Sequence, residues 1–463
     1  MPKITADQPL SAEPSITVGA DGCLRGGSPT LIAALKQELT IANPAHQDAK
    51  KYGRWIGKRI KPFLYFFKDQ KGGFRFPRGF AKEAILLCQR LNGARPEIID
   101  QRVEQPPIEL QFKGELRPYQ EKAVADVLQR DFGVLEAGTG AGKTVIAIAV
   151  IAARKQPTLI LVHTKELLHQ WAERIETFLG IKAGLIGDGH NEPGIVTVAI
   201  VNSARRRLEE LTPLFGQLCV DECHRVPASL FTDVVTAFAC RYSLGLSATA
   251  FRRDGLTRLI SFYLGAPVHR VSKQHLHATG AVLKPLFLQR ETGFLFSYRG
   301  DYQTLMTTLT HDEGRNRQIA ADIIAETGND TGTILVVSDR VSHCELLAEI
   351  LAENAIPTSV LTGALPKEKR TAIVDDVREG RVKVLISTVQ LIGEGFDCPG
   401  LSTLFLTTPI KFSGRLLQVV GRILRPAAAD KQPKVYDYVD PVGVLKSSAR
   451  ARQAVYQEEL PYE

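Results

Sequence analysis

Residues 134–144 read VLEAGTGAGKT, a short apolar run followed by spaced glycines and a lysine–threonine pair. The apolar run predicts a strand at Phe132–Glu136, and the apolar residues after the lysine predict a helix at Lys143–Arg154. Because glycine has no Cβ, the backbone N–H groups of the loop can wrap phosphate oxygens at the N-terminus of that helix. In such a loop the lysine reaches the outer phosphates and the threonine hydroxyl ligates Mg²⁺. The stretch therefore predicts a nucleotide-phosphate and Mg²⁺ site made by Gly138, Thr139, Gly140, Gly142, Lys143 and Thr144.

A second anchor for the metal is expected at the end of another strand. The run LCVDECH at 218–224 is an apolar strand that ends in two carboxylates. Asp221 is predicted to hold Mg²⁺ through water, and Glu222 to orient and polarise the attacking water. The alternative is that the two acids only cap the helix that follows them.

Outward from these motifs, short apolar runs alternate with amphipathic helices from residue 111 onwards, which is typical of βα units around a parallel sheet. One series of expected strands is 132–136, 158–163, 196–201, 218–221 and 242–246, and a second is 283–288, 333–337, 358–361, 383–387, 403–406 and 435–439. We therefore expect an α/β protein with two parallel-sheet lobes, at 111–265 and 283–463, joined by a hinge at 266–282.

The first 110 residues have a different pattern. Ser28–Thr40 and Phe80–Leu91 have the periodicity of short helices, and the aromatic-rich segment between them favours strands. Proline-rich stretches lie at both ends of this region, so we expect a separate small α+β domain at 1–110.

Charge in this small domain is concentrated in one segment. Residues 50–82 contain eleven Lys and Arg against one acid, Asp69, and nine of the aromatics of the chain. The formal net charge of the whole chain, by comparison, is only +8. Cations for phosphates and ring faces for bases are what a nucleic-acid surface needs. The alternative is a β-rich core of aromatics with solvated charges outside. The cations expected to grip nucleic acid are Lys50, Lys51, Arg54, Lys58, Arg59 and Lys61.

Composition excludes several classes of protein. Hydrophobic residues make up 44% and charged residues 23%, which are ordinary globular values. The longest apolar run is far shorter than the ~20 residues of a transmembrane helix, and the N-terminus has no signal-peptide pattern. Seven cysteines without metal-site spacing favour a reducing compartment. We therefore expect a soluble cytoplasmic protein, nucleoid-associated if bacterial or phage.

Further motifs follow in a fixed order. LRPYQ (116–120) precedes the phosphate loop, and LVHTKELLHQW (161–171), VTVAIVNSA (196–204) and SATA (247–250) follow it. The second lobe has ILVVSDR (334–340), VLTG (360–363), VLISTVQLIGEGFDCP (384–399) and QVVGRILRP (418–426). With GTGAGKT and DECH, this ordered set resembles helicase superfamily two, the ATP-driven nucleic-acid motors, and the resemblance implies that the two lobes are RecA-like.

The resemblance implies roles for individual residues. It implies that ATP and Mg²⁺ are the cofactors and that Arg117, Gln120, Gly395, Asp397 and Gln418 contact the nucleotide. It implies coupling of hydrolysis to movement by His224, Ser247, Ala248 and Thr249. It implies nucleic-acid contacts by Thr164, Lys165, Asn202, Ser203, Ser338, Arg340, Thr362, Gly363 and Thr388.

Arg422 and Arg425 have a physical reason of their own. They lie three residues apart on an amphipathic helix and so share one face. Phosphoryl transfer builds charge on equatorial oxygens, and a permanently charged planar guanidinium stabilises that charge. If this face meets Lys143, the catalytic site is complete only when the lobes close, which converts turnover into movement.

GLSATAFRRDG (245–255) and GRILRP further resemble the group of XPB-like and UvsW-like DNA helicases, which also have a small N-terminal DNA-binding module. The resemblance implies an ATP-dependent DNA helicase or translocase that remodels branched, forked or damaged duplex DNA. The alternatives are an RNA helicase, the motor subunit of a restriction or defence complex, and an ATP-gated clamp or annealer with little turnover.

Overall fold

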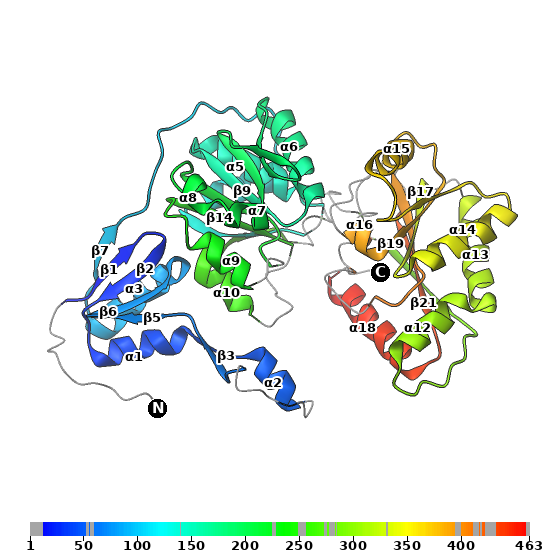
Figure 1. Cartoon of the computed structure of the whole chain (residues 1–463), viewed down its shortest axis with the longest axis horizontal. Helices are drawn as coiled ribbons and strands as arrows, with labels where there is room; N and C mark the ends of the chain where they lie inside the picture. Colours follow the sequence, from blue (N-terminus) through cyan, green and yellow to red (C-terminus); the bar gives the residue numbers. More distant parts are fainter. Residues whose placement is uncertain are drawn as a thin grey trace. The chain divides into compact units, whose positions relative to one another are not determined.

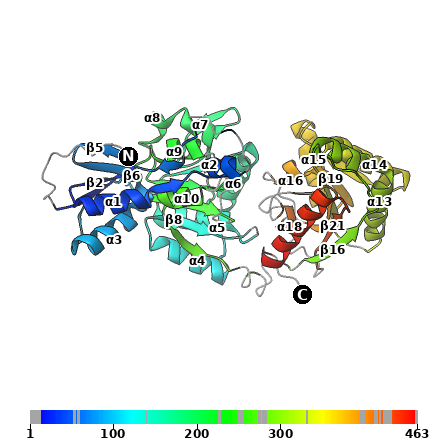
Figure 2. The same ribbon diagram turned by 90° about the horizontal axis from the view of Figure 1, so that it is seen from below.

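The computed structural model describes residues 13–51, 55, 60–138, 140–224, 228–248, 256–272, 276, 283, 285–329, 332–393, 400–410, 416, 419–421 and 432–459. The chain forms two compact units. One comprises residues up to Ala137 together with Gly142–Val271, and the other comprises Gly138–Ala141 together with the chain from Ser272 onwards. Each unit is described separately below, and Figures 1 and 2 show their elements from two directions.

The first unit begins with a small α+β domain. Its five-stranded sheet has the order β5-β6-β2-β1-β7. The strands are β1 (Ser15–Val18), β2 (Asp21–Arg25), β5 (Lys68–Gln70), β6 (Gly73–Pro77) and β7 (Glu97–Asp100). Two helices, α1 (Pro29–Glu38) and α3 (Ala81–Asn92), share its core with residues of β1, β2 and β6, among them Phe74 and Phe76. Ser28 caps α1 by accepting from Leu31 N–H, and Pro29 opens the helix, as the sequence predicted.

An arm extends from this domain between α1 and β5 (Figure 1). In it β3 (Thr40–Ala42) pairs with β4 (Phe63–Tyr65), and α2 (Pro44–Lys51) follows β3. Leu64 and Phe66 pack against the core of the neighbouring lobe, so one side of this two-stranded ribbon is fixed.

The N-terminal domain docks on the first lobe through the short helix η1 (Arg78–Phe80). The Arg78 guanidinium, only 1% exposed, donates hydrogen bonds to the carbonyl oxygens of Phe238 and Cys240, both at 2.9 Å. A Cβ at Gly79 would lie 2.5 Å from the backbone nitrogen of Gly265, so the two backbone segments are in contact there. The ring of Phe80 meets Phe262 edge-on at 5.8 Å. The domain and the lobe therefore share one packed boundary.

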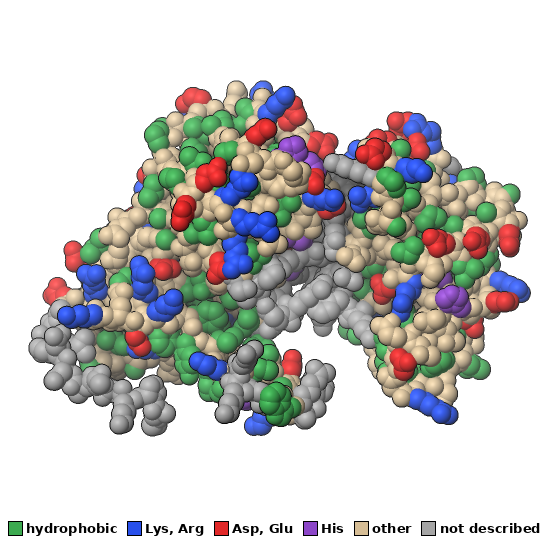
Figure 3. Space-filling model, in the orientation of Figure 1, with side chains coloured by type: hydrophobic (Ala, Val, Ile, Leu, Met, Phe, Trp, Pro, Cys, Tyr) green, Lys and Arg blue, Asp and Glu red, His purple; other side chains and the backbone are tan. Residues whose placement is uncertain are grey.

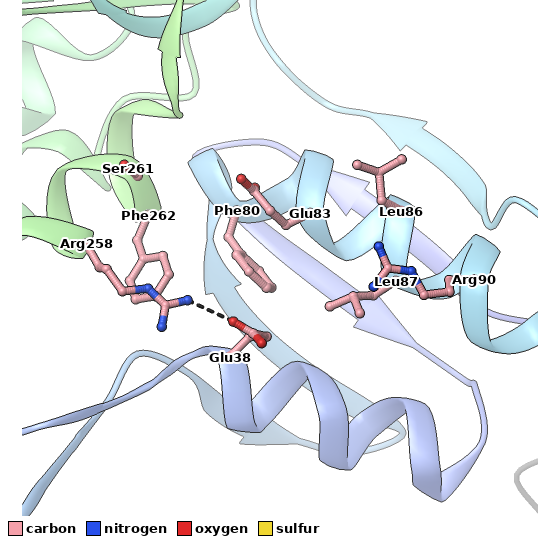
Figure 4. A pocket seen from close by; sticks show the side chains of 9 residues that line it. All are labelled: Glu38, Phe80, Glu83, Leu86, Leu87, Arg90, Arg258, Ser261 and Phe262. Atoms are coloured by element: carbon pink, nitrogen blue, oxygen red, sulfur yellow. Dashed lines mark hydrogen bonds and ion pairs between the residues drawn. The ribbon is translucent and has the colours of Figure 1, made fainter.

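A pocket of about 310 Å³ lies at this boundary, lined by α1, η1, α3 and helix α10 (Thr257–Leu264) of the lobe. Figure 4 shows Arg258 of α10 pointing toward Glu38 of α1, and the two form an ion pair at 2.9 Å.

The first lobe is a parallel sheet of order β11-β10-β12-β9-β13-β14-β8-β15, in which only β11 runs antiparallel to its neighbour. Its strands are β8 (Phe132–Glu136), β9 (Thr158–Val162), β10 (Gly184–Gly187), β11 (His190–Glu192), β12 (Val196–Ile200), β13 (Gln217–Val220), β14 (Tyr242–Ser247) and β15 (Pro267–Arg270).

Helices cover both faces of this sheet. Residues of α4 (Pro118–Leu128), α5 (Lys143–Arg154) and α6 (Lys165–Leu179) enter one apolar core. Residues of α7 (Val201–Arg205), α8 (Leu208–Leu211), α9 (Ala228–Val235) and α10 enter the other. This doubly wound arrangement leaves the carboxyl ends of the strands at one edge, where ligands bind in such folds.

The second unit contains an all-parallel sheet of order β16-β21-β20-β17-β19-β18. Its strands are β16 (Leu286–Glu291), β17 (Thr333–Ser338), β18 (Thr358–Leu361), β19 (Val384–Thr388), β20 (Leu401–Leu406) and β21 (Lys434–Val439). Its described helices are α12 (Tyr302–His311), α13 (Glu313–Thr327), α14 (Val341–Glu353), α15 (Lys367–Arg378), α16 (Val389–Gly393) and α18 (Gly443–Glu459).

The predicted fold class, two RecA-like lobes after a small α+β domain, is confirmed. The end of the first lobe differs from the prediction, because β15 pairs with β8 inside the range 266–282 that was expected to be hinge. This edge strand reads PVHR and has no apolar run to mark it. Likewise β16 begins at Leu286 rather than at 283. Within the described part of the chain, no helix is long and apolar enough to span a bilayer.

Candidate nucleotide site and nucleic-acid surface

The glycine-rich loop lies between β8 and α5, as the sequence predicted. Gly140 and Gly142 have φ of +87° and +76°, a left-handed backbone that favours glycine. A Cβ at Gly142 would also lie 2.4 Å from Gln120 Nε2, so a side chain there would displace the glutamine. Among the described residues, none lies within 4 Å of a Cβ placed at Gly138, so they leave space beside the loop backbone there. The loop thus offers N–H groups at the start of α5.

Lys143, the first residue of α5, lies over this loop. Its Nζ donates to the carbonyl oxygen of Ala137 at 3.1 Å and lies 4.0 Å from Glu222 Oε1. Ala137 stands where the strict phosphate-loop pattern has glycine; it is 1% exposed, and its own N–H bonds to the Ser247 carbonyl. The alanine methyl group at this position is therefore accommodated in the buried start of the loop.

The acidic pair follows β13 directly. Asp221, 6% exposed, continues the strand by donating its N–H to the Leu161 carbonyl. Glu222 has φ of +46°, which is strained for a residue with a Cβ. This turn of the backbone places Glu222 Oε1 near Lys143 Nζ, and Asp221 Oδ1 accepts the Glu222 N–H at 2.9 Å. The strain is of the kind found at functional sites.

Trp171 of α6 holds the other oxygen of the first acid. Its indole Nε1–H donates to Asp221 Oδ2 at 2.8 Å, and its ring is 1% exposed. Trp171 is therefore a core residue of the first lobe. Burial, and next the charge of Glu222, raise the pKa of Asp221, while the Trp171 hydrogen bond and the Lys143 charge lower it.

A second contact that the sequence did not reveal lies just before the loop. Glu136, the last residue of β8, is 5% exposed, and its Oε2 accepts from Arg270 Nε at 2.5 Å. Arg270 belongs to β15, the unpredicted edge strand. No sequence signal connects two residues this far apart.

His224 lies between the acids and β14. Its Nδ1 is 3.0 Å from Ser247 Oγ and 3.3 Å from Glu222 Oε2. Ser247 ends β14, is fully buried, and is followed by Ala248. The described part of the DECH and SATA motifs is therefore joined by side-chain contacts.

Arg117 and Gln120 lie at the start of α4. Gln120 Oε1 accepts the Arg117 N–H at 2.9 Å, which caps the helix, and the glutamine is 6% exposed. As noted above, the Gln120 amide lies against Gly142. The motif expected to contact the adenine base therefore packs against the phosphate loop, through Gln120 and Gly142.

The donor set of this site fits a nucleotide with Mg²⁺. A threonine hydroxyl at Thr144 and a carboxylate at Asp221 are the hard oxygen ligands that Mg²⁺ takes. The open space at Gly138 and the ammonium of Lys143 suit phosphate oxygens.

The expected nucleic-acid residues of the first lobe gather at one sheet edge. Thr164 caps α6 and accepts the Leu167 N–H, and Lys165 after it is exposed. Asn202, exposed, and Ser203 lie on α7. Because α6 and α7 follow the adjacent parallel strands β9 and β12, the two pairs share an edge.

The expected residues of the second lobe differ in exposure. Gly363 is exposed, and Arg340 and Thr388 are half-buried. Ser338 is fully buried; its hydroxyl accepts the Arg340 N–H at 3.2 Å and lies 2.9 Å from His343 Nδ1. Thr362 is 5% exposed. In this structure Ser338 is therefore a support for Arg340 rather than a surface residue.

In the N-terminal domain Lys50 and Lys61 are exposed, and Lys51 ends α2. The remaining predicted site residues lie outside the described residues: Arg54, Lys58, Arg59, Thr139, Thr249, Gly395, Asp397, Gln418, Arg422 and Arg425.

Comparison with known proteins matches two families. Residues 113–252 match "Type III restriction enzyme, res subunit", and residues 315–427 match "Helicase conserved C-terminal domain". Together they cover more than half of the chain.

Two relatives extend the match. The chain is 26% identical over 378 residues to "Probable helicase D10" of Escherichia phage T5, covering 79% of this chain and 80% of that protein. It is 29% identical over 356 residues to "DNA 3'-5' translocase XPB2" of Sulfurisphaera tokodaii, covering 68% and 79%. The solved structure of S. cerevisiae Dbp5 bound to RNA and ADP BeF3 has a TM-score of 0.55 at 17% identity, covering 75% of this chain and 88% of that one, a likeness of fold.

Proposed function

Because the chain belongs to helicase superfamily two and is a nucleic-acid-dependent ATPase, we propose that it is a DNA translocase that remodels branched, forked or damaged duplexes. The observation that carries the ATPase part is the convergence of Lys143, Asp221 and Glu222 within one described site. The DNA part is supported by the relative that is named as a DNA translocase and by the basic segment 50–82.

Each residue of the site has a part in this proposal. When bound by Thr144 and Asp221, Mg²⁺ would neutralise charge on the phosphates. Lys143 binds the outer phosphates, for which it would exchange its hydrogen bond to the Ala137 carbonyl. Glu222 orients the attacking water, since its strained backbone aims the carboxylate toward Lys143. Arg422 and Arg425 remain proposed as the cations that stabilise the transition state, on the sequence reasoning given above.

Coupling of hydrolysis to movement is proposed to pass through His224. Its ring contacts both Glu222 and Ser247. A movement of the glutamate side chain during turnover would therefore displace His224 and, through it, Ser247 at the end of β14. The exposed Lys165 and Asn202 are proposed to contact the nucleic-acid strand at the neighbouring edge.

The test is a steady-state ATPase assay of the full chain with single strands, duplexes, forks and four-way junctions, in DNA and in RNA. We expect DNA to stimulate turnover more than RNA does, and forks or junctions more than plain duplex. Glu222→Gln should abolish stimulated turnover while Glu209→Gln, an exposed acid of α8, should not. Unchanged turnover in Glu222→Gln would remove the assignment of the water-orienting carboxylate, and preference for RNA would make the protein an RNA helicase.

A second candidate is the motor subunit of a restriction or defence complex, because the family matched by the first lobe carries that name. Purification of the native protein with a nuclease partner would favour it. An ATP-gated clamp would instead show one turnover and then stop, which pre-steady-state kinetics would detect.

A further inference from the structure

The β3–β4 ribbon of the N-terminal arm presents two aromatic rings on one face. Phe63 and Tyr65 are 46% and 58% exposed, whereas aromatics of the same segment such as Phe74 and Phe76 are core residues. The two exposed rings lie two residues apart on β4, so they point to the same side of the strand. The sequence left open whether these aromatics are core or contact surface, and the structure divides them between the two.

The ribbon presents both rings to solvent, and the Tyr65 ring also meets Phe67 edge-on at 5.8 Å. Leu64 between them points the other way and packs against the core of the first lobe. Across the ribbon the rings face Ala42 and Thr40, whose small side chains leave the ring faces uncovered from that side. Exposed aromatics on a fixed strand with small neighbours resemble the stacking surfaces of nucleic-acid-binding sheets.

The charge around the ribbon is complementary to a nucleic acid. Lys50 of α2 and Lys61 just before β4 are exposed, and the surrounding segment 50–82 contains a single acid. Figure 3 shows hydrophobic and Lys or Arg side chains side by side on this arm. Cations beside aromatic rings are the two components that a strand of nucleotides requires.

The spacing of the rings selects the form of nucleic acid. Residues two apart on a strand are separated by about 6.6 Å, roughly twice the 3.4 Å between stacked bases. In an intact duplex every base is covered on both faces, so only phosphates and groove edges are offered. A ring can stack only on a base that has been unstacked from a neighbour.

We propose that Phe63 and Tyr65 form a base-stacking surface for unpaired nucleotides next to duplex DNA. This deepens the proposed function and rests on it: the arm distinguishes gaps, forks and junctions from continuous duplex. Lys50 and Lys61 supply affinity for phosphates, and the two rings supply the preference for unpaired bases.

The experiment compares binding of the full chain to a paired duplex and to the same duplex with a short single-stranded gap that carries 2-aminopurine. We expect the wild type to prefer the gapped DNA, with the probe fluorescence changing on stacking. The variant Phe63→Leu/Tyr65→Leu should lose at least tenfold in affinity for gapped DNA, since each stacked base contributes about five- to 150-fold, and nothing for duplex.

Three controls make the result specific. Phe63→Tyr/Tyr65→Phe keeps both rings and should keep the gap preference. Leu86→Ser removes an exposed apolar side chain of α3, away from the ribbon, and should change neither affinity. Lys50→Gln/Lys61→Gln should weaken both DNAs equally and reduce the salt dependence, because these cations contact phosphates.

Equal loss on both DNAs, or no loss on gapped DNA, in the folded ring variant would overturn the stacking surface. Duplex-stimulated ATPase in a wild type with no gap preference would overturn the stacking surface alone. A wild type that bound neither DNA and showed no stimulation would overturn the proposed DNA function, and the stacking surface with it.

Discussion

The indole Nε1–H of Trp171 donates a hydrogen bond to Asp221 Oδ2 at 2.8 Å, although the two residues are fifty positions apart. Since the Glu222 N–H holds Oδ1, both oxygens of the proposed Mg²⁺-binding carboxylate have a fixed direction. We therefore expect the indole to position the proposed metal-binding carboxylate, which a ring without a donor would not do.

Trp171→Phe should raise the Mg²⁺ concentration needed for half-maximal ATPase and lower the maximal rate by about tenfold, because a hydrogen bond to a charged group contributes roughly 1.5–3 kcal/mol. Metal titration of the ATPase measures both effects. Ile175→Val, in the same helix and core, changes packing without touching Asp221 and should leave the metal dependence alone. An identical metal dependence in Trp171→Phe would show that the indole only fills space.

Arg78 joins the N-terminal domain to the first lobe. Arg78→Met should destabilise this boundary by about 2–4 kcal/mol, because the carbonyls of Phe238 and Cys240 lose a buried donor. Faster limited proteolysis within residues 101–117 and a lower melting temperature would report the loosening. Arg75→Met, on the exposed side of β6, is the matched control and should behave as the wild type does. Equal proteolysis in both variants would mean that the domain is held by its apolar contacts alone.

The buried His343 should make the stability of the second lobe depend on pH. Burial, and next the charges of Arg315 and His311, lower its pKa to about 3. In the unfolded chain the His343 side chain has the ordinary histidine pKa near 6.5. Below pH 6.5 the unfolded state therefore binds a proton that the folded state does not bind. Stability due to this group is therefore complete above pH 6.5 and is lost as the pH falls toward 3, by up to about 1.4 kcal/mol per pH unit.

Hydrogen exchange of the β17 amides at pH 5 and pH 7 measures that loss. His343→Gln should remove most of the difference between the two pH values, whereas His311→Gln, which removes only a minor cause of the lowered His343 pKa, should reduce it slightly. A pH dependence that survives in His343→Gln would assign the acid sensitivity to other groups.

Much of the fold could be predicted because buried parallel strands are continuous apolar runs. β8, β9 and β17 are such runs, and the glycine loop and DECH motif follow strands at fixed spacing. The edge strand β15 could not be predicted, because a strand with only one neighbour in the sheet does not need a continuous apolar run. The predicted ATP site could be assembled because its parts end adjacent strands of one sheet.

Other contacts could not be predicted, because they depend on packing between distant segments. Arg78 is one of the eleven Lys and Arg residues of segment 50–82, yet it is buried against backbone carbonyls. Charge and composition treat Phe63 and Phe74 alike, and only the side of the strand on which each lies separates a surface ring from a core ring. The same holds for the Glu136–Arg270 ion pair.

The packed boundary at Gly79 and Phe262 has a consequence for how the proposed translocase would hold DNA. A DNA-binding domain joined by a flexible linker could bind and release DNA independently of the lobes. Here the N-terminal domain packs directly on the first lobe, so if it binds DNA as proposed, its DNA-contacting surface keeps a fixed position on that lobe and moves with it.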